Sequence, residues 1–166
     1  MKNIFTFLQK NSKYIRLVLF IAYCLFILCY TVLCREKGYM HKADLRFMWA
    51  YREMLTGHPE WKEDVFQNIA NILFFVPYGA LFPKVKNGSQ STKSLNRWQL
   101  VLIVGVLFSI VIEITQYITC RGLCELDDVV CNGLGALIGY WLYISIKKSM
   151  ERSKNRIMEK LNETAP

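Results

Sequence analysis

Four long apolar segments follow one another along the chain of 166 residues, and polar stretches separate them. Arg16 is the only charged residue in the first segment and Glu113 the only one in the third, whereas the second and fourth contain no charge. A helix crosses a bilayer with roughly 20 apolar residues, within a range of about 17 to 25. The pattern therefore predicts an all-α, polytopic membrane protein with a single domain, 1–166, and transmembrane helices at about 15–34, 65–82, 99–119 and 129–146.

The segment 35–64, between the first two apolar segments, shows a shorter helical pattern that ends at Gly57 and Pro59. The residues along one predicted helical face are Leu45, Met48, Trp49 and Leu55. Such an aromatic-rich pattern predicts a short helix that lies in the membrane interface. Two interpretations stay open: the helix is an aromatic anchor, or it is a lid over a site formed by the spans.

Lysine and arginine are unevenly distributed among the connecting segments. They dominate the tail before the first span, the loop 83–97 and the tail after residue 146, whereas 120–128 holds one arginine and three acids. Because segments rich in Lys and Arg stay in the cytoplasm, we expect both termini to be cytoplasmic and the loops 35–64 and 120–128 to lie outside. This bias accounts for the net charge of +8, so the charge indicates contact with anionic lipid and no nucleic-acid partner. The first span is expected to be retained, since it is long and lacks a small-x-small cleavage site.

Six cysteines and two histidines do not form a metal-binding pattern. No C-x-x-C pair occurs, so we expect no zinc site, no other metal and no cofactor. Cys120 and Cys124 fall near the outer surface, where a disulfide can form in an oxidising compartment.

Polar residues recur at helical spacing in three of the apolar segments. The sets are Asp64, Asn68 and Asn71; Glu113, Gln116 and Tyr117; and Asp127, Asp128 and Asn132. Spacings of three and four residues put the members of the first two sets on one helix face each, and Asn132 lies one turn below Asp128. The predicted orientation brings the three polar faces to the same outer level. The predicted binding site is therefore Asn68, Asn71, Glu113, Gln116, Arg121, Asp127, Asp128 and Asn132.

Glu113 is the strongest functional candidate in this set. A carboxylate in hydrocarbon costs several kcal/mol unless it is neutral, paired or facing water. Arg121 is its predicted partner if the helix continues past Cys120. Glu113 and Asp128 are also candidates for acid–base catalysis. The structural alternatives are that Asp64 and Asp128 cap helix N-termini, and that the amides only join helices through hydrogen bonds.

Four residues are predicted to shape the helices rather than to bind. Pro77 lies inside the second span, where it removes a backbone donor and predicts a kink before Gly79. Gly135 and Gly139 form a small-xxx-small pair that allows the fourth span to pack closely.

Two blocks of these residues carry a family resemblance. Asn71, Phe75, Pro77 and Gly79 in NIANILFFVPYG match the N-x-x-x-F-x-P-x-G signature of the VanZ-like membrane proteins. The second block, which runs from Glu113 to Gly135, resembles that family's E-x-x-Q…R…D-D-x-x-x-N-x-x-G pattern, and the similarity covers roughly 45–141. The resemblance implies a multi-pass protein of the bacterial plasma membrane, with a role in low-level resistance to teicoplanin, a lipid-tailed glycopeptide antibiotic.

Three functions remain open on this evidence. The first is a cell-envelope protein that binds a membrane lipid or another amphipathic, lipid-linked molecule in an outer polar cleft. The second is an intramembrane enzyme that acts on a lipid-linked substrate, with Glu113 and Asp128 as its acid–base pair. The third is a proton-coupled carrier, for which four short spans would need a homo-oligomer.

Overall fold

The computed structural model describes residues 2–57, 59, 61–82 and 96–163, and most of these residues are helical. The loop 83–97, predicted to connect the second and third spans, lies almost wholly outside the described residues. In chain order the elements are α1 (Lys2–Leu28), η1 (Cys29–Leu33), β1 (Ala43–Asp44), α2 (Trp49–Thr56), α3 (Trp61–Leu81), α4 (Arg97–Thr119), β2 (Cys124–Glu125) and α5 (Leu126–Glu163).

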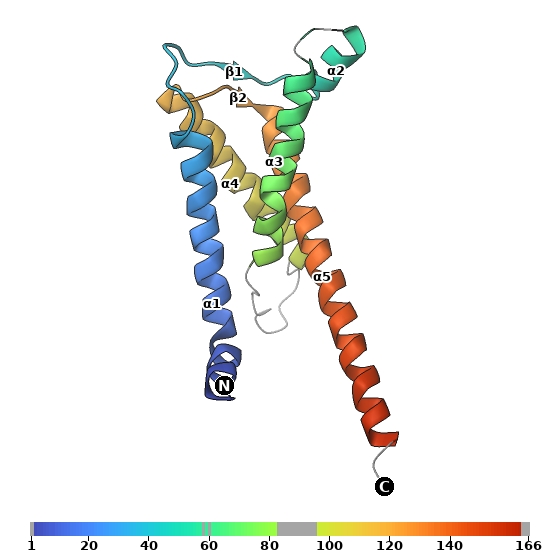
Figure 1. Cartoon of the computed structure of the whole chain (residues 1–166). Coiled ribbons are helices and arrows are strands. Elements are labelled where there is room, and N and C mark those ends of the chain that lie inside the picture. Colours follow the sequence, from blue (N-terminus) through green and yellow to red (C-terminus); the bar gives the residue numbers. More distant parts are fainter. Residues whose placement is uncertain (1, 58, 60, 83–95, 164–166) are drawn as a thin grey trace.

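The long helices form a bundle with two different ends (Figure 1). At one end, β1, β2 and α2 cover the helices; we call this the capped end. At the other, which we call the terminal end, α1 begins and α5 extends beyond the rest of the bundle. The segments 35–57 and 120–125 therefore share one end of the molecule, and the start of α1 and the end of α5 lie at the other.

Three helical segments are long and apolar enough to cross a membrane: Tyr14–Leu33, Arg97–Thr119 and Leu126–Glu159. They coincide with the first, third and fourth predicted spans. The second predicted span, 65–82, falls in α3, a helix of 21 residues whose first turn includes Glu63 and Asp64. α3 is not among the three candidate spans, so a fourth crossing remains a prediction.

α3 and α5 approach each other through their glycines. A Cβ on Gly135 would lie 2.2 Å from the Ile72 carbonyl oxygen, and one on Gly139 would lie 1.9 Å from that of Val76. From the other side, a Cβ on Gly79 would lie 1.9 Å from the Ala136 carbonyl oxygen. Only hydrogen fits at these three positions, so the two backbones are in direct contact. α3 continues through Pro77 without a break in helical structure.

The apolar core lies toward the terminal end of this contact. Its buried residues are Ile27, Phe75, Tyr78, Phe82, Val101, Ile112, Ala136 and Tyr140, which come from α1, α3, α4 and α5. The rings of Tyr78 and Phe108 stack with their centroids 5.7 Å apart. Aromatic pairs of this kind add specificity to the area that they bury.

Two arginines donate hydrogen bonds to backbone carbonyls at the terminal end of α3. Arg16 donates hydrogen bonds to the carbonyls of Ala80 and Leu81, the latter at 3.0 Å, and Arg97 donates to that of Phe82 at 3.2 Å. These carbonyls belong to the last two residues of α3 and to the residue that follows it, so they have no backbone donor within the helix. The Arg16 guanidinium also lies over a tyrosine ring of α5, 4.1 Å from its centroid.

The capped end contains a two-stranded parallel sheet that the all-α prediction lacks. β1 and β2 pair Ala43 with Cys124 and Asp44 with Glu125. Each strand is two residues long, and the pairing joins segments about 80 residues apart, so local sequence patterns give no signal for it.

The short helix predicted in 35–64 is present as α2, but it begins at Trp49. Leu45 and Met48 therefore lie outside it. Met48 has a left-handed backbone with φ 53°, and its N–H donates to the Asp127 carboxylate at 2.5 Å. This contact to α5 stops the helix from starting earlier. The position of α2 in a membrane interface remains a prediction.

Candidate functional site

Four carboxyl groups are buried together below the capped end. Glu113, Glu125, Asp127 and Asp128 are each no more than 5% exposed. They come from the last turns of α4, from β2 and from the first turn of α5. Since buried charges are costly unless they are paired or share protons, this arrangement requires nearby donors and cations.

Glu113 binds backbone rather than a basic side chain. Its Oε2 accepts a hydrogen bond from the N–H of Glu125 at 2.9 Å, which fixes β2 against α4. The connection between α4 and α5 thus folds back over the carboxylate that stood out in the sequence.

Gln67 of α3 joins two of the four carboxyls. Its Nε2 donates to Glu125 Oε2 at 2.6 Å and lies 3.4 Å from Asp128 Oδ2. Asp128 Oδ1 is buried and has no hydrogen-bond partner among the described residues. The Asn71 side chain is near enough to interact with the Asp128 carboxyl. Its Nδ2 is buried, but no acceptor among the described residues meets the distance and angle of a hydrogen bond. One buried donor, Asn71 Nδ2, and one buried acceptor, Asp128 Oδ1, are therefore unused where α3 faces α5.

The environment of Glu125 favours its neutral form. Burial, followed by the proximity of Asp128, raises the pKa of Glu125 to about 8, and the positive charge of Arg35 partly opposes this rise. At neutral pH the group therefore holds a proton for much of the time.

Two of the other predicted residues, Asn132 and Gln116, connect helices. Asn132 Nδ2 donates to the hydroxyl of Ser109 at 2.8 Å, and Gln116 Nε2 donates to the carbonyl of Thr31 in η1 at 2.9 Å. Asn68 is buried in α3, and its Nδ2 has no partner among the described residues. The amides of Asn132 and Gln116 thus hold α4 to α5 and to η1.

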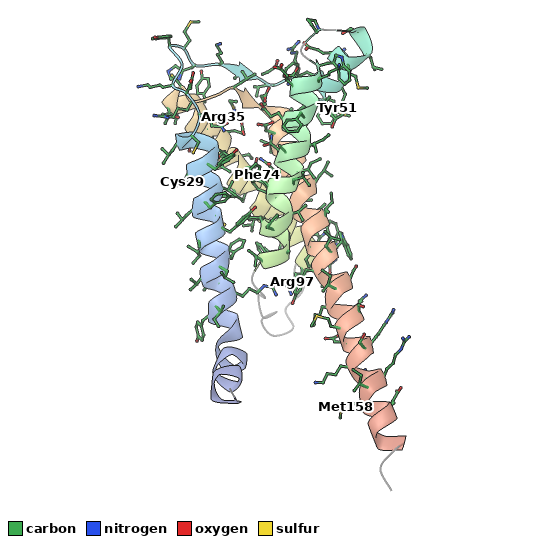
Figure 2. The ribbon with its side chains drawn as sticks, viewed as in Figure 1. Cys29, Arg35, Tyr51, Phe74, Arg97 and Met158 are labelled. Atoms are coloured by element: carbon green, nitrogen blue, oxygen red, sulfur yellow. The ribbon has the colours of Figure 1, made fainter. Side chains whose placement is uncertain are left out.

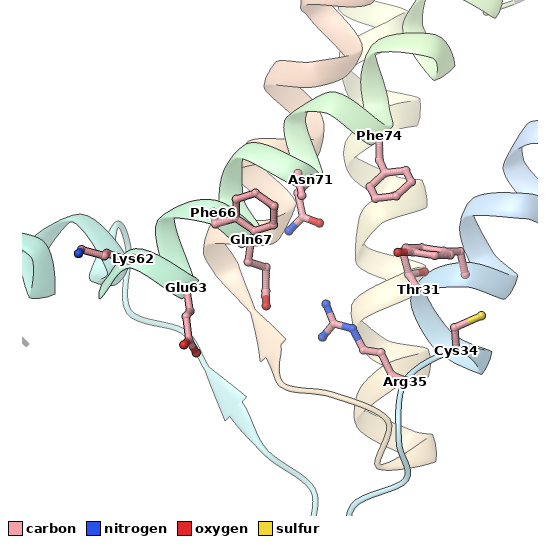
Figure 3. Close-up of a pocket in the computed structure, with 11 residues that line it drawn as sticks. Thr31, Cys34, Arg35, Lys62, Glu63, Phe66, Gln67, Asn71 and Phe74 are labelled. Carbon is pink, nitrogen blue, oxygen red and sulfur yellow. The ribbon is translucent and has the colours of Figure 1, made fainter. Parts of the chain in front are cut away.

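A groove of about 620 Å³ opens beside this cluster, between η1 with the turn after it and the face of α3. Figure 3 shows Arg35, Gln67 and Asn71 at one part of it and the Phe74 ring at another. The lining residues are Tyr30, Thr31, Cys34, Arg35, Lys62, Glu63, Phe66, Gln67, Ala70, Asn71 and Phe74. Of the predicted binding residues, only Asn71 lines the groove directly.

Arg35, which the sequence did not single out, is the basic residue that faces the carboxyls. The positive charge of Arg35 attracts the carboxyl groups of Glu113, Glu125 and Asp128. Gly122 has φ 112°, and a Cβ there would lie 2.6 Å from Arg35 Nη1, so the arginine lies directly against this glycine. Within the described part of the chain, the Arg35 side chain makes no hydrogen bond or ion pair.

The predicted partnership of Glu113 with Arg121 does not occur. α4 ends at Thr119, and Cys120 has a left-handed backbone with φ 55°, so the helix does not continue to Arg121. Arg121 Nη1 instead donates to the carbonyls of Leu33 and Arg35, at 3.1 and 2.9 Å. Arg121 thereby holds in place the turn that carries Arg35.

Gln67, Arg35 and Glu125 were not among the predicted binding residues. Helical spacing could have identified Gln67, but it could not have identified Arg35 or Glu125. Gln67 lies three residues after Asp64 and four before Asn71, so it fits the helical face of those residues as well as Asn68 does. Arg35 and Glu125 are brought in by the turn after η1 and by the β1–β2 pairing, which depend on contacts between distant segments.

Among the described residues, the cysteines and His41 belong to no group that could hold a metal ion. Across residues 2–57, 61–82 and 96–163, no group of three or more His, Cys, Asp and Glu side chains is arranged to hold a metal ion. All six cysteines, including Cys120 and Cys124, are free thiols. Cys120 Sγ lies 3.3 Å from His41 Nδ1, and that nitrogen also lies 2.6 Å from the Tyr117 carbonyl oxygen, to which it donates.

Comparison with known proteins gives a consistent family relationship. The family model described as VanZ/LLP1 matches residues 20–147. Protein VanZ of Enterococcus faecium is 29% identical over 86 residues, which are 52% of this chain and 49% of that protein. The chain thus matches about half the length of this curated relative. No solved structure is significantly similar. The family match covers most of the chain, including α3, α4 and the apolar part of α5, and the chain belongs to the VanZ/LLP1 family of membrane proteins.

Proposed function

We propose that this protein is a multi-pass protein of the bacterial cell envelope that binds an amphipathic or lipid-linked molecule in the groove between η1 and α3. Through that binding it contributes to resistance to a glycopeptide such as teicoplanin. The groove is the observation that carries the proposal. In this arrangement α3 is a fourth crossing, the capped end faces outward, and α2 lies in the outer interface.

The charge distribution supports this orientation. The part of α5 that extends past the bundle carries Lys147, Lys148, Arg152 and further basic residues, and it lies at the terminal end with the start of α1. The four buried carboxyls lie near the capped end. Segments rich in lysine and arginine stay in the cytoplasm, so the carboxyls and the groove face the outer leaflet.

The chemistry of the groove suits a molecule with a polar head and an apolar tail. Tyr30, Phe66 and Phe74 offer ring surfaces, and Arg35 and Asn71 offer donors for which no acceptor is recorded among the described residues. Binding sites of this kind combine mostly apolar walls with a few polar groups that fix orientation. Figure 2 shows Arg35 in the turn after η1 and Phe74 on α3.

A test is to fill the groove. Ala70→Trp places a ring in the groove, whereas Leu73→Trp adds the same ring on an exposed side of α3 (63% exposed). We expect Ala70→Trp to lose lipid that co-purifies with the protein, measured by native mass spectrometry, and to lose any teicoplanin resistance conferred in a susceptible host. Leu73→Trp should keep both. Equal lipid binding by the two variants would reject the groove as the site.

Glu113→Gln separates binding from catalysis. The substitution keeps an oxygen acceptor for the Glu125 N–H but removes the acid. If the protein acts by binding, resistance should be partly retained at normal expression. Complete loss would favour the enzyme.

The buried carboxyls support one alternative, an intramembrane enzyme with Glu113 and Asp128 as acid and base. The unpartnered Asp128 Oδ1 beside the groove is the observation that favours it. Turnover of a polyprenyl or phospholipid substrate by the purified protein, abolished by Asp128→Asn, would establish this alternative. A proton-coupled carrier would instead show uptake that depends on a pH gradient in proteoliposomes.

A further inference from the structure

We propose that the ligand of the groove is zwitterionic: an anionic group binds the Arg35 guanidinium and the Asn71 amide, while an amine attached nearby binds the Gln67 side-chain oxygen, next to Glu125 and Asp128. This identification of the ligand class rests on the function proposed above, in which an amphiphile occupies the groove. An ethanolamine phosphate head group has this chemistry.

Arg35 and Asn71 provide the anion-binding half. Arg35 lines the groove, and no described residue accepts a hydrogen bond from its side chain. A guanidinium offers five donors in a planar fork that fits phosphate and carboxylate. Asn71 Nδ2 is a second donor without a partner, and Figure 3 shows Arg35, Asn71 and Gln67 pointing into the same space.

Gln67 and the carboxyls behind it provide the amine-binding half. The Nε2 of Gln67 is bound to Glu125, so the side chain can present only its oxygen, an acceptor, to a ligand. The same Nε2 lies 3.4 Å from Asp128 Oδ2, and Asp128 is 2% exposed and keeps one oxygen without a partner among the described residues. A primary amine in this position would donate hydrogen bonds and add a positive charge beside both acids.

Charge balance favours a zwitterion over a simple anion. Arg35 is the cation that acts on Glu113, Glu125 and Asp128. An anion bound to Arg35 would cancel part of that charge and leave the buried carboxyls less stabilised, because Coulomb interactions are stronger away from bulk water. A positively charged amine on the same molecule would replace the part of the Arg35 charge that the bound anion cancels.

The experiment compares phosphatidylethanolamine with phosphatidylglycerol of identical acyl chains in competition for the purified full chain, by native mass spectrometry. We expect phosphatidylethanolamine to bind at least about tenfold more tightly, which corresponds to about 1.4 kcal/mol. Glu125→Gln keeps an acceptor for Gln67 but removes the acid, and should reduce this preference severalfold. Arg35→Gln should weaken both lipids together. The matched controls are Glu36→Gln and Arg46→Gln, exposed residues of the capped end that do not line the groove.

A second variant protects the test against misfolding. Gln67→Met removes the amide oxygen without adding a charge, so it should also reduce the preference if Glu125→Gln fails to fold. Two further arms identify the source of the head group. Competition by teicoplanin alone would indicate a glycopeptide ligand, and competition by glycerophosphoethanolamine, which has no acyl chains, would indicate that the head group of a lipid is recognised.

The two proposals fail in different ways. Equal binding of both lipids, displaced by Ala70→Trp, would overturn the zwitterion while leaving the groove as a binding site. A preference for phosphatidylethanolamine that Glu125→Gln and Gln67→Met leave unchanged would also overturn it. Binding of either lipid that Ala70→Trp does not affect would overturn the proposed function itself.

Discussion

The two ends of the helix bundle use polar residues in different ways. At the terminal end, Arg16 and Arg97 donate to the last carbonyls of α3 and complete the fold around an aromatic core. At the capped end, carboxyls and amides are buried in a cluster, and it holds six of the eight buried polar atoms that have no partner among the described residues. Unpaired buried groups cost stability, so their concentration at the capped end supports the proposal that a ligand binds there.

The largest expected effect comes from the contact that holds both halves together. Gly139→Leu would place a Cβ 1.9 Å from the Val76 carbonyl oxygen and force α3 away from α5. We expect a destabilisation of more than about 3 kcal/mol, or failure to accumulate in the membrane, since backbone cannot move aside as a side-chain tip can.

Gly133→Ala is the matched control on the same helix. Its Cβ would meet only side-chain atoms of Leu102 and Val106, at 3.2 to 3.3 Å. Detergent-solubilised protein should show a thermal midpoint close to that of the wild type. If Gly139→Leu were equally mild, direct contact of α3 with α5 could not be what positions Asn71 beside Asp128.

The next largest effect concerns the terminal end. Arg16→Gln shortens the side chain and leaves the carbonyls of Ala80 and Leu81 without their donor. Hydrogen bonds from charged groups contribute about 1.5–3 kcal/mol, so the thermal midpoint in detergent should fall clearly while lipid binding to the folded protein is kept. Lys147→Gln removes an exposed ion pair with Glu151 and should have little effect. If Arg16→Gln lost lipid binding but kept its stability, the terminal end would contribute to binding, and the proposed difference between the two ends would be wrong.

These residues also show how far the sequence could predict the structure. Hydropathy placed three spanning helices correctly, because bilayer thickness imposes a length that a sequence reveals directly. Helical spacing selected Asn71, Glu113, Asp128 and Asn132, all of which lie in or beside the cluster described above.

The rest depended on contacts that spacing does not encode. Arg35 faces the carboxyls because Arg121 holds its turn and Gly122 makes room for its side chain. Glu125 is buried because β2 pairs with a strand far away in the chain. The sequence pattern favoured Arg121 as the partner of Glu113, since it is the nearest cation along the chain, but the end of α4 at Thr119 turns it away.

An intermediate effect is expected from pH at the capped end. The pKa of Glu125 is raised from its ordinary 4.5 to about 8 by burial and by Asp128. The folded protein therefore binds this proton more tightly than the unfolded chain does. The free energy of unfolding should fall as pH rises from about 4.5 to about 8 and level off above it.

This dependence of stability on pH can be followed by measuring the thermal midpoint of unfolding between pH 5 and pH 9 at constant ionic strength. Glu125→Gln cannot ionise, so it should flatten the decline. Charged groups that face Glu125 from other elements are Glu113, Asp127, Asp128, Asp64 and Arg35. A wild-type midpoint that rises over this range would show that Glu125 is ionised and well paired in the folded protein.

The smallest effect should come from a charge pair at the surface of the capped end. Asp44 accepts hydrogen bonds from Arg46, which lowers the pKa of the Asp44 carboxyl, but the Arg46 side chain is 64% exposed. Water and salt screen such pairs, so Asp44→Asn should change the thermal midpoint by little more than the error of the measurement, in low and high salt alike. The cap is expected to depend instead on backbone bonds, such as that from Cys124 N–H to the Lys42 carbonyl at 3.0 Å. A large, salt-sensitive loss in Asp44→Asn would mean that exposed charges, and not the buried cluster and its backbone contacts, hold the capped end together.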